Sequence, residues 1–149
     1  MTRLTTEETL VELAKLGPHT NETMHEAYEL VFAPWVKAQG LQLLDCEVGR
    51  VKARLPQDPE QQFFTGAMCG QALMSAVDTV MSMAMHTYDR TSRGTASQNN
   101  QFLRAAIGDD LIIEAQVLKM GKNSAYGEVF VTFEGSGDLV VHSTAEFAF

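Results

Sequence analysis

The chain has few basic residues for its number of acidic ones. Its 149 residues include 11 lysines and arginines against 19 aspartates and glutamates, a formal net charge of −8 at pH 7. A general nucleic-acid-binding protein needs a basic face, so this balance argues against that class. A local basic cluster can still bind an anionic ligand. With 45% hydrophobic and 20% charged residues, the composition is that of a globular protein rather than a disordered one.

Cysteines and long apolar segments are also scarce. The two cysteines, Cys46 and Cys69, form no CxxC pair, and one distant pair is no disulfide framework. Asp78 interrupts the longest apolar run, so no segment approaches the ~20 residues that a membrane span needs. Residues 1–8 contain no apolar core of a signal peptide. We therefore expect a soluble cytoplasmic protein without membrane association.

Nothing in the sequence indicates a metal site or a bound cofactor. The histidines show no HxxxH spacing and no accompanying acidic ligand. They are His19, His25, His86 and His142.

The length fits one domain that buries its own core, and no repeat, linker or low-complexity tract divides it. We expect a single domain over residues 1–149. Within it, residues 1–39 should form a helical extension and residues 40–149 the core.

Two helices are predicted in the extension. The first ends at Gly17-Pro18, and the second starts near Asn21, is kinked or restarted at Pro34 and ends at Gly40. Apolar residues at helical spacing mark both helices. They are Leu10, Leu13, Ala14 and Leu16 in the first, and Met24, Ala27, Tyr28, Val31 and Phe32 in the second.

The rest of the chain reads as strands around one long helix. Residues 41–55 are predicted as a strand with an interruption, such as a bulge, at Gly49, and residues 70–88 as the helix. Short connectors containing glycine then join alternating runs, which is typical of antiparallel hairpins. These runs cover residues 95–103, 111–119, 126–133 and 139–149. The helix is apolar nearly all round, so we expect an α+β fold in which an antiparallel sheet of about five strands wraps around it.

Asp78 is the most informative residue of the long helix. A lone carboxylate in an apolar helix should be partly desolvated, which favours its neutral form and suits a general base or a nucleophile. The alternative is a structural acid, hydrogen-bonded to the backbone or to hydroxyl groups. Residues three, four and seven positions away should share its helix face. They are Gln71, Met74, Ser75, Met81, Ser82 and Met85.

Three segments give the chain a resemblance to a known family. They are GAMCGQALMSAVDT (residues 66–79), QFLRAAIGDDLIIEAQVLKMGK (residues 101–122) and YGEVFVTFEGSGDLVVHSTAEFAF (residues 126–149). The first resembles the loop-helix motif G-x-x-H-G-G, followed by an aspartate, of the hot-dog fold acyl-CoA thioesterases. The whole is similar to the phenylacetate-pathway branch of the 4-hydroxybenzoyl-CoA thioesterase superfamily and covers about two thirds of the chain.

The resemblance implies hydrolysis of an acyl-CoA thioester without a cofactor. It assigns Asp78 to the catalytic carboxylate, the backbone N–H of Gly70 to the thioester carbonyl and Thr95 to the attacking water. In this family the glycine and the acid come from opposite subunits, so it also implies a homodimer or a dimer of dimers. Basic side chains that could meet the phosphates of coenzyme A are Arg104, Lys119 and Lys122.

Some positions depart from the family's pattern. Cys69 replaces the motif histidine, Gln71 its second glycine, and Phe63 an asparagine found in many relatives. With Met74, these residues are expected to contact the substrate, and Phe63 and Met74 suggest an apolar or aromatic acyl group. Cys69 is expected to fill space rather than to act as a nucleophile, since no partner base lies near it in sequence. A module that binds acyl-CoA without hydrolysing it remains the alternative function, and a dehydratase is a more distant one.

Overall fold

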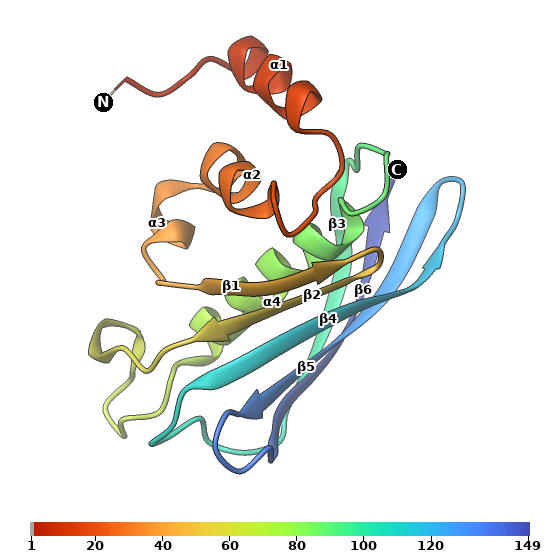
Figure 1. The fold of residues 1–149 in the computed structure, drawn as a ribbon. Coiled ribbons are helices and arrows are strands. Elements are labelled where there is room, and N and C mark those ends of the chain that lie inside the picture. Colours follow the sequence, from red (N-terminus) through yellow and green to blue (C-terminus); the bar gives the residue numbers. More distant parts are fainter. Residues whose placement is uncertain (1) are drawn as a thin grey trace.

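Helix α4 (Gly70–Met85) is the element around which the sheet closes (Figure 1). The computed structural model describes residues 2–149. Its six strands form one sheet in the order β1-β2-β4-β5-β6-β3, and each neighbouring pair is antiparallel. The strands are β1 (Gln42–Glu47), β2 (Arg50–Leu55), β3 (Gly94–Phe102), β4 (Leu111–Met120), β5 (Ser124–Phe133) and β6 (Leu139–Ala148). The predicted α+β fold, with a sheet wrapped around one helix, is confirmed.

Alternating burial along the strands builds the core. In β5, for example, Val129 and Val131 are fully buried, whereas Phe130 between them points to the outer face and stacks on His142. The buried side chains of α4, such as Val77 and Met81, belong to the same apolar cluster. Alternate strand residues point to opposite faces, so a single period-two pattern supplies both this core and the solvent face.

The segment 41–55 is a hairpin, not the single interrupted strand that the sequence predicted. Glu47 of β1 pairs with Arg50 of β2, and Val48 and Gly49 make the turn between them. Gly49 has φ +79°, a conformation that glycine adopts without steric cost. Its N–H donates to Thr87 Oγ1 at 2.7 Å, which ties the turn to the end of α4. The sheet consequently has six strands rather than about five.

Three helices precede the sheet: α1 (Thr6–Leu16), α2 (Met24–Val31) and α3 (Pro34–Lys37). Pro34 restarts the chain as α3, one of the two predicted outcomes. Helix α2 begins at Met24, later than predicted. Asn21 lies in the loop before it, where its side-chain oxygen accepts the backbone N–H of Cys46 at 2.8 Å. A short 3-10 helix, η1 (Pro59–Gln61), follows β2. No helix in this described part of the chain is long and apolar enough to span a bilayer.

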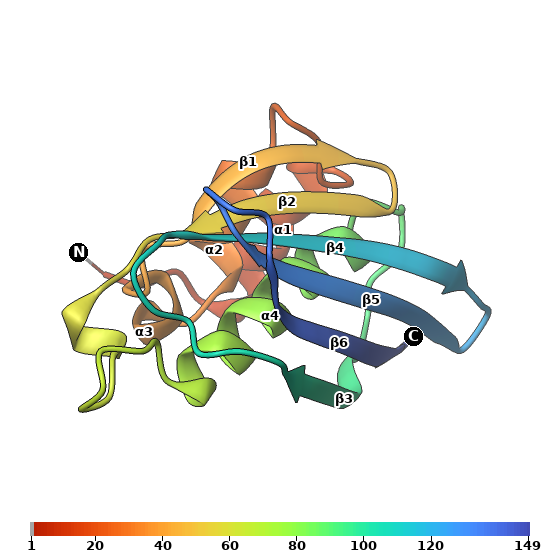
Figure 2. The ribbon, with the colours of Figure 1, turned by 90° about the horizontal axis from the view of Figure 1, so that it is seen from below.

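Helix α4 is buried unevenly, contrary to the expectation of a helix enclosed all round. Ten of its residues are buried, including Met81 and Met85, which therefore belong to the core rather than to the open face predicted for Asp78. Gln71 and Met74 are exposed, and Asp78 is half-buried. Seen from below (Figure 2), β3 forms one border of the sheet. The open side of α4 lies along that border, which positions the site described next.

The β1–β2 turn generates a stability prediction. A Cβ added at Gly49 would lie 2.9 Å from the Tyr88 hydroxyl oxygen, whereas one at Gly137 (φ +74°) would meet nothing within 4 Å. Gly137→Ala should lower the free energy of unfolding by about 1–2 kcal/mol, the cost of a left-handed conformation. Gly49→Ala should lower it by about 1 kcal/mol more, the low end of the overpacking cost, because the movable end of the Tyr88 side chain must shift. Urea denaturation of the two variants checks this, and equal losses would contradict the role given to Tyr88.

Candidate active site

The Asp78 carboxylate lies against the edge strand of the sheet. Thr95, at the start of β3, donates its hydroxyl hydrogen to Asp78 Oδ1 at 2.5 Å. The carboxylate is half-buried and the threonine is exposed. Asp78 therefore has the hydroxyl partner that a structural acid would need. The same pair is also accessible to an approaching molecule.

Helix α4 and strand β3 run side by side in opposite directions. Along their length, Thr95 bonds Asp78, and Gln98 Nε2 donates to the Met74 carbonyl oxygen at 3.2 Å. At the other end the Phe102 ring covers Gly70, where an added Cβ would lie 3.6 Å from it. We call this line the α4–β3 seam. It consists of Gly70, Met74 and Asp78 on α4, and Thr95, Gln98 and Phe102 on β3.

The first N–H groups of α4 are open to a ligand. Cys69 caps the helix in an extended conformation (φ −68°, ψ 152°) and makes no side-chain cap hydrogen bond. Within residues 2–149, the N–H of Gly70 has no acceptor. Free N–H groups at a helix start carry partial positive charge, so they can polarise a carbonyl or stabilise an oxyanion.

The loop before α4 is held in place by backbone and side-chain hydrogen bonds. The N–H of Cys69 donates to the Gln61 carbonyl at 2.8 Å. The buried side chain of Gln39 donates to the Ala72 carbonyl at 3.0 Å and to Gln61 Oε1 at 3.1 Å, and it accepts from the Ser75 hydroxyl at 2.8 Å. Gln39 thus connects this loop to the helix. No sequence pattern marked it, because a lone glutamine carries no periodic signal.

The predicted substrate contacts gather around the start of α4. Phe63 is 47% exposed and Met74 39%, while Gln71 is exposed and Cys69 half-buried. Sequence reasoning missed Phe64, which is 97% exposed, and Phe102, which is 49% exposed. The Phe63 and Phe64 rings contact each other edge to face, with centroids 5.7 Å apart, so apolar surface is open to solvent just before α4. Two adjacent aromatic residues before a glycine turn were the available signal for Phe64.

Gly70 and Asp78 lie too far apart to act on one carbonyl within a single chain. Both sit on α4, which rises ~1.5 Å per residue, so their separation along the axis is roughly 12 Å. The two groups therefore need either different substrates or a second chain.

The three predicted phosphate contacts do not form one patch in a single chain. Lys119 pairs with Tyr126 near one end of the sheet, whereas Arg104 follows β3 at the opposite end. At ~3.3 Å per residue these ends are roughly 20 Å apart along the strands. Lys122 lies in the turn beside Lys119. Arg104 donates from Nε to the Leu139 carbonyl at 2.9 Å.

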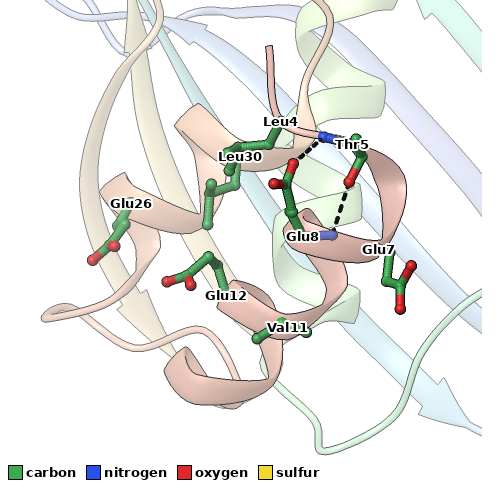
Figure 3. Close-up of a pocket in the computed structure, with 8 residues that line it drawn as sticks. All are labelled: Leu4, Thr5, Glu7, Glu8, Val11, Glu12, Glu26 and Leu30. Atoms are coloured by element: carbon green, nitrogen blue, oxygen red, sulfur yellow. Dashed lines mark hydrogen bonds between the residues drawn. The ribbon is translucent and has the colours of Figure 1, made fainter. Parts of the chain in front are cut away.

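Two hollows in the described residues have linings that contain neither Asp78 nor Thr95. The first, of about 780 Å³, lies between α1 and α2 (Figure 3). Glutamates surround it, and the hydrogen bonds drawn there are the capping box of α1, in which Glu8 N–H donates to Thr5 Oγ1 and Thr5 N–H to Glu8 Oε2. Its acidic rim would repel the phosphates of a nucleotide. The lining residues are Leu4, Thr5, Glu7, Glu8, Val11, Glu12, Glu26 and Leu30.

The second hollow, of about 840 Å³, lies under α1 beside the C-terminal end of α4. We call it the distal cleft. It includes Ser82 and His86 of the α4 end and Gly94, the residue before Thr95.

The remaining titratable residues give no metal centre. Among residues 2–149, no three His, Cys, Asp or Glu side chains come close enough together to hold a metal ion. His142 Nε2 instead lies 3.0 Å from Glu128 on the outer sheet face.

Comparisons with known proteins agree with the fold. Residues 65–139 match the family model of the thioesterase superfamily. The human protein named acyl-coenzyme A thioesterase 13 is 28% identical over 100 residues, which cover 66% of this chain and 71% of that protein. The mouse protein of that name is 30% identical over 77 residues, 50% of this chain and 55% of its own.

Solved structures share the whole architecture. Zebra fish thioesterase superfamily member 2 superposes with a TM-score of 0.80 at 24% identity, covering 87% of this chain and 98% of that chain. The PaaI protein from the phenylacetic acid degradation operon of E. coli superposes with a TM-score of 0.77 at 20% identity, covering 85% and 90%. At these identities the likeness shows the common fold, the hot-dog fold.

The two cysteines should differ in reactivity. Cys46 is buried, and burial raises the pKa of its thiol to about 11, so little thiolate forms at pH 8. Cys69 is half-buried at the helix start. Iodoacetamide at pH 8 should therefore alkylate Cys69 in the native protein and leave Cys46 unmodified, as read by mass spectrometry of peptides. Denatured protein, in which both should react, is the control, and native labelling of Cys46 would contradict its burial.

Proposed function

This chain belongs to the thioesterase superfamily and is a thioester hydrolase, and we propose that its substrate is an acyl-CoA thioester. The matched region contains Gly70, Asp78 and Thr95. The named relatives are acyl-coenzyme A thioesterases, which supports coenzyme A as the thiol. The observation that carries the proposal is the short hydrogen bond between Thr95 and Asp78 on the open side of α4.

The proposed chemistry uses groups that the structure leaves available. The N–H of Gly70 polarises the thioester carbonyl, and the N-terminal end of the α4 dipole stabilises the developing oxyanion. Asp78 then activates a water molecule as a general base, or attacks the carbonyl itself and expels the thiolate to give a short-lived anhydride that water hydrolyses. Thr95 fixes the Asp78 carboxylate and helps to hold the water. Hydrolysis yields the free acid and coenzyme A with its thiol restored.

Two copies of the chain are proposed to share each site. Strand β3 is an edge strand with one row of backbone groups unpaired among residues 2–149. A second copy that pairs antiparallel with β3 about a two-fold axis would cover this edge.

The register of the seam supports that arrangement. If the axis passes near Gln98 and Asn99, Thr95 of one copy lies level with Phe102 of the other. Because Thr95 accompanies Asp78 and Phe102 accompanies Gly70, the acid of one chain then lies level with the glycine of its partner. A homodimer, alone or within a dimer of dimers, would thereby remove the roughly 12 Å separation along α4. The pairing would also bring one chain's Arg104 to the same end of the joined sheet as the other's Lys119 and Lys122.

Substrate contacts follow from the same placement. Phe63, Cys69, Gln71 and Met74 surround the start of α4 and are proposed to contact the thioester and the first part of its acyl group. A cytoplasmic location stays a prediction from the sequence.

A binding module that holds acyl-CoA without turnover is the second candidate. The observation in its favour is that Phe63, Cys69 and Gln71 stand where the family pattern has an asparagine, a histidine and a second glycine, which alters the polar lining around the chemistry. It differs from the hydrolase in one measurable respect, because it would bind acyl-CoA with Asp78 intact and release no thiol.

Substitution at the Asp78–Thr95 pair tests the assignment. Asp78→Asn keeps the shape and removes the base, so kcat should fall by about 10²–10⁴-fold, the usual contribution of a positioned acid or base. Thr95→Val should lower kcat less, and Thr95→Ser should retain most activity because it keeps the hydroxyl. Thiol release from short, medium, long and aryl acyl-CoAs measures this, with size-exclusion chromatography to confirm an unchanged oligomer.

The outcomes separate the two candidates. Full turnover in Asp78→Asn would contradict the role of the carboxylate. Tight binding of acyl-CoA without thiol release by the wild-type protein would favour the binding module.

A further inference from the structure

The distal cleft begins where the α4–β3 seam ends. Asp78, Ser82 and the C-cap residue His86 succeed one another at four-residue spacing, so each lies one turn farther along α4 and only about 40° farther around it than the one before. The last two line the cleft, as does Gly94, the neighbour of Thr95. A molecule held at Asp78 that extends toward the C-terminal end of α4 would therefore enter this cleft.

One wall of the cleft is apolar and lacks a covering partner within residues 2–149. It is formed by Leu10, Leu13 and Ala14 of α1 with Val31 and Phe32 at the end of α2. Leu10 is 57% exposed and Val31 43%, and α1 as a whole has no buried residue. A cleft of about 840 Å³ with such a wall has the size and lining of a site for a small molecule.

The opposite wall is polar, and hydrogen bonds to backbone carbonyls fix the orientation of its two imidazole rings. His86 Nδ1–H donates to the Ser82 carbonyl at 2.7 Å, so its Nε2 is free to accept from the Ser92 hydroxyl at 3.2 Å. His19 Nδ1–H donates to the Met83 carbonyl at 3.1 Å, and burial lowers the pKa of this histidine.

The charges of the cleft come from its loop. Arg90 is engaged with the carbonyls of Gly121 and Lys122 and lies over the Phe149 ring. Arg93 lines the cleft, and its guanidinium makes no hydrogen bond or ion pair with any of residues 2–149. Asp89 is the one acidic residue in the lining. The local balance is therefore positive in a protein of net charge −8, which favours an anionic group.

We propose that the distal cleft receives the acyl chain of the substrate and that Arg93 and Ser92 select chains ending in a carboxylate. The inference rests on the proposed function, because it takes Asp78 as the position of the thioester. An extended chain of about eight to ten carbons covers the roughly 12 Å between Asp78 and His86 along the helix axis. The substrate class is thus an ω-carboxyacyl-CoA of medium length, and hydrolysis releases a dicarboxylic acid.

The test compares two substrates of equal length, decanoyl-CoA and ω-carboxynonanoyl-CoA. The wild-type protein should hydrolyse the second with a kcat/KM about tenfold higher, the effect of one charge-assisted hydrogen bond. Arg93→Gln should abolish this preference. The matched control is Lys15→Gln, which removes an exposed charge on α1 outside the cleft and should leave the preference unchanged. An equal rate for both substrates, or a preference that survives in Arg93→Gln, would overturn the assignment of the polar end.

A second pair of variants tests occupancy of the cleft. Ala14→Trp places a large ring against the apolar wall. It should lower the ratio of kcat/KM for decanoyl-CoA to kcat/KM for butyryl-CoA about tenfold. Lys15→Trp, at the neighbouring position of α1, is the control. An unchanged ratio would overturn the cleft as the acyl site. So would a change in oligomeric state on size-exclusion chromatography without a change in chain preference, because the cleft would then be a contact between subunits.

Failure of hydrolysis is distinguishable from failure of the cleft. If the wild-type protein releases no thiol from any substrate, the proposed function is wrong, and calorimetric binding of the same two acyl-CoAs then decides the inference. Tighter binding of the ω-carboxyacyl-CoA that is lost in Arg93→Gln would support it, and equal binding would overturn it.

Discussion

A single rigid helix carries both groups of the proposed chemistry, and its length fixes how they can act. Gly70 opens α4 and Asp78 follows two turns later, so no change of rotamer brings the two to one carbonyl. The hydrogen bond from Thr95 to Asp78 and the contact of Phe102 with Gly70 register the helix against β3. The edge of the sheet is thereby part of the site, which makes the pairing of two edges a requirement of the chemistry rather than an accessory to it.

The core holds α4 in that register. Val77, Val80 and Met81 are fully buried against the sheet. Met81 also approaches Gly127 so closely that an added Cβ there would lie 2.5 Å from it. Densely packed interiors transmit small displacements. A substitution beneath the helix should therefore move the whole line of seam residues together.

The sequence predicts those parts of the fold that depend on periodicity. Alternation located β4, β5 and β6 to within two residues, and the apolar run located α4 from its first residue. The β1–β2 hairpin escaped prediction because a glycine in a strand-like run signals a bulge as readily as a turn, and the φ of Gly49 decides between them. The capping box of α1 is formed by Thr5 and Glu8. Thr5 is the N-cap, one residue before Thr6, where the helix begins.

Site residues were predictable where the family pattern names them and not where tertiary contacts decide. Arg104 follows β3 and Lys119 lies near the end of β4. These two strands run in opposite directions with β5 and β6 between them, so their C-terminal ends lie at opposite ends of the sheet. Met81 and Met85 share helical spacing with Asp78 but face the sheet, because the apolar face of α4 is wider than a spacing rule assumes. The distal cleft joins α1 to a loop about eighty residues later, which no local pattern contains.

Subunit mixing tests most directly whether Gly70 and Asp78 act from different chains. Gly70 is the first residue of α4, where proline is well tolerated, and Cys69 before it is extended, so Gly70→Pro removes the N–H without breaking the helix. Gly70→Ala, which keeps the N–H, is the control. Gly70→Pro and Asp78→Asn should each be inactive alone, and unfolding and refolding them together in equal amounts should restore roughly a quarter of wild-type activity, since half of the dimers then hold one intact site. No recovery, from a mixture shown to contain heterodimers, would contradict the shared site.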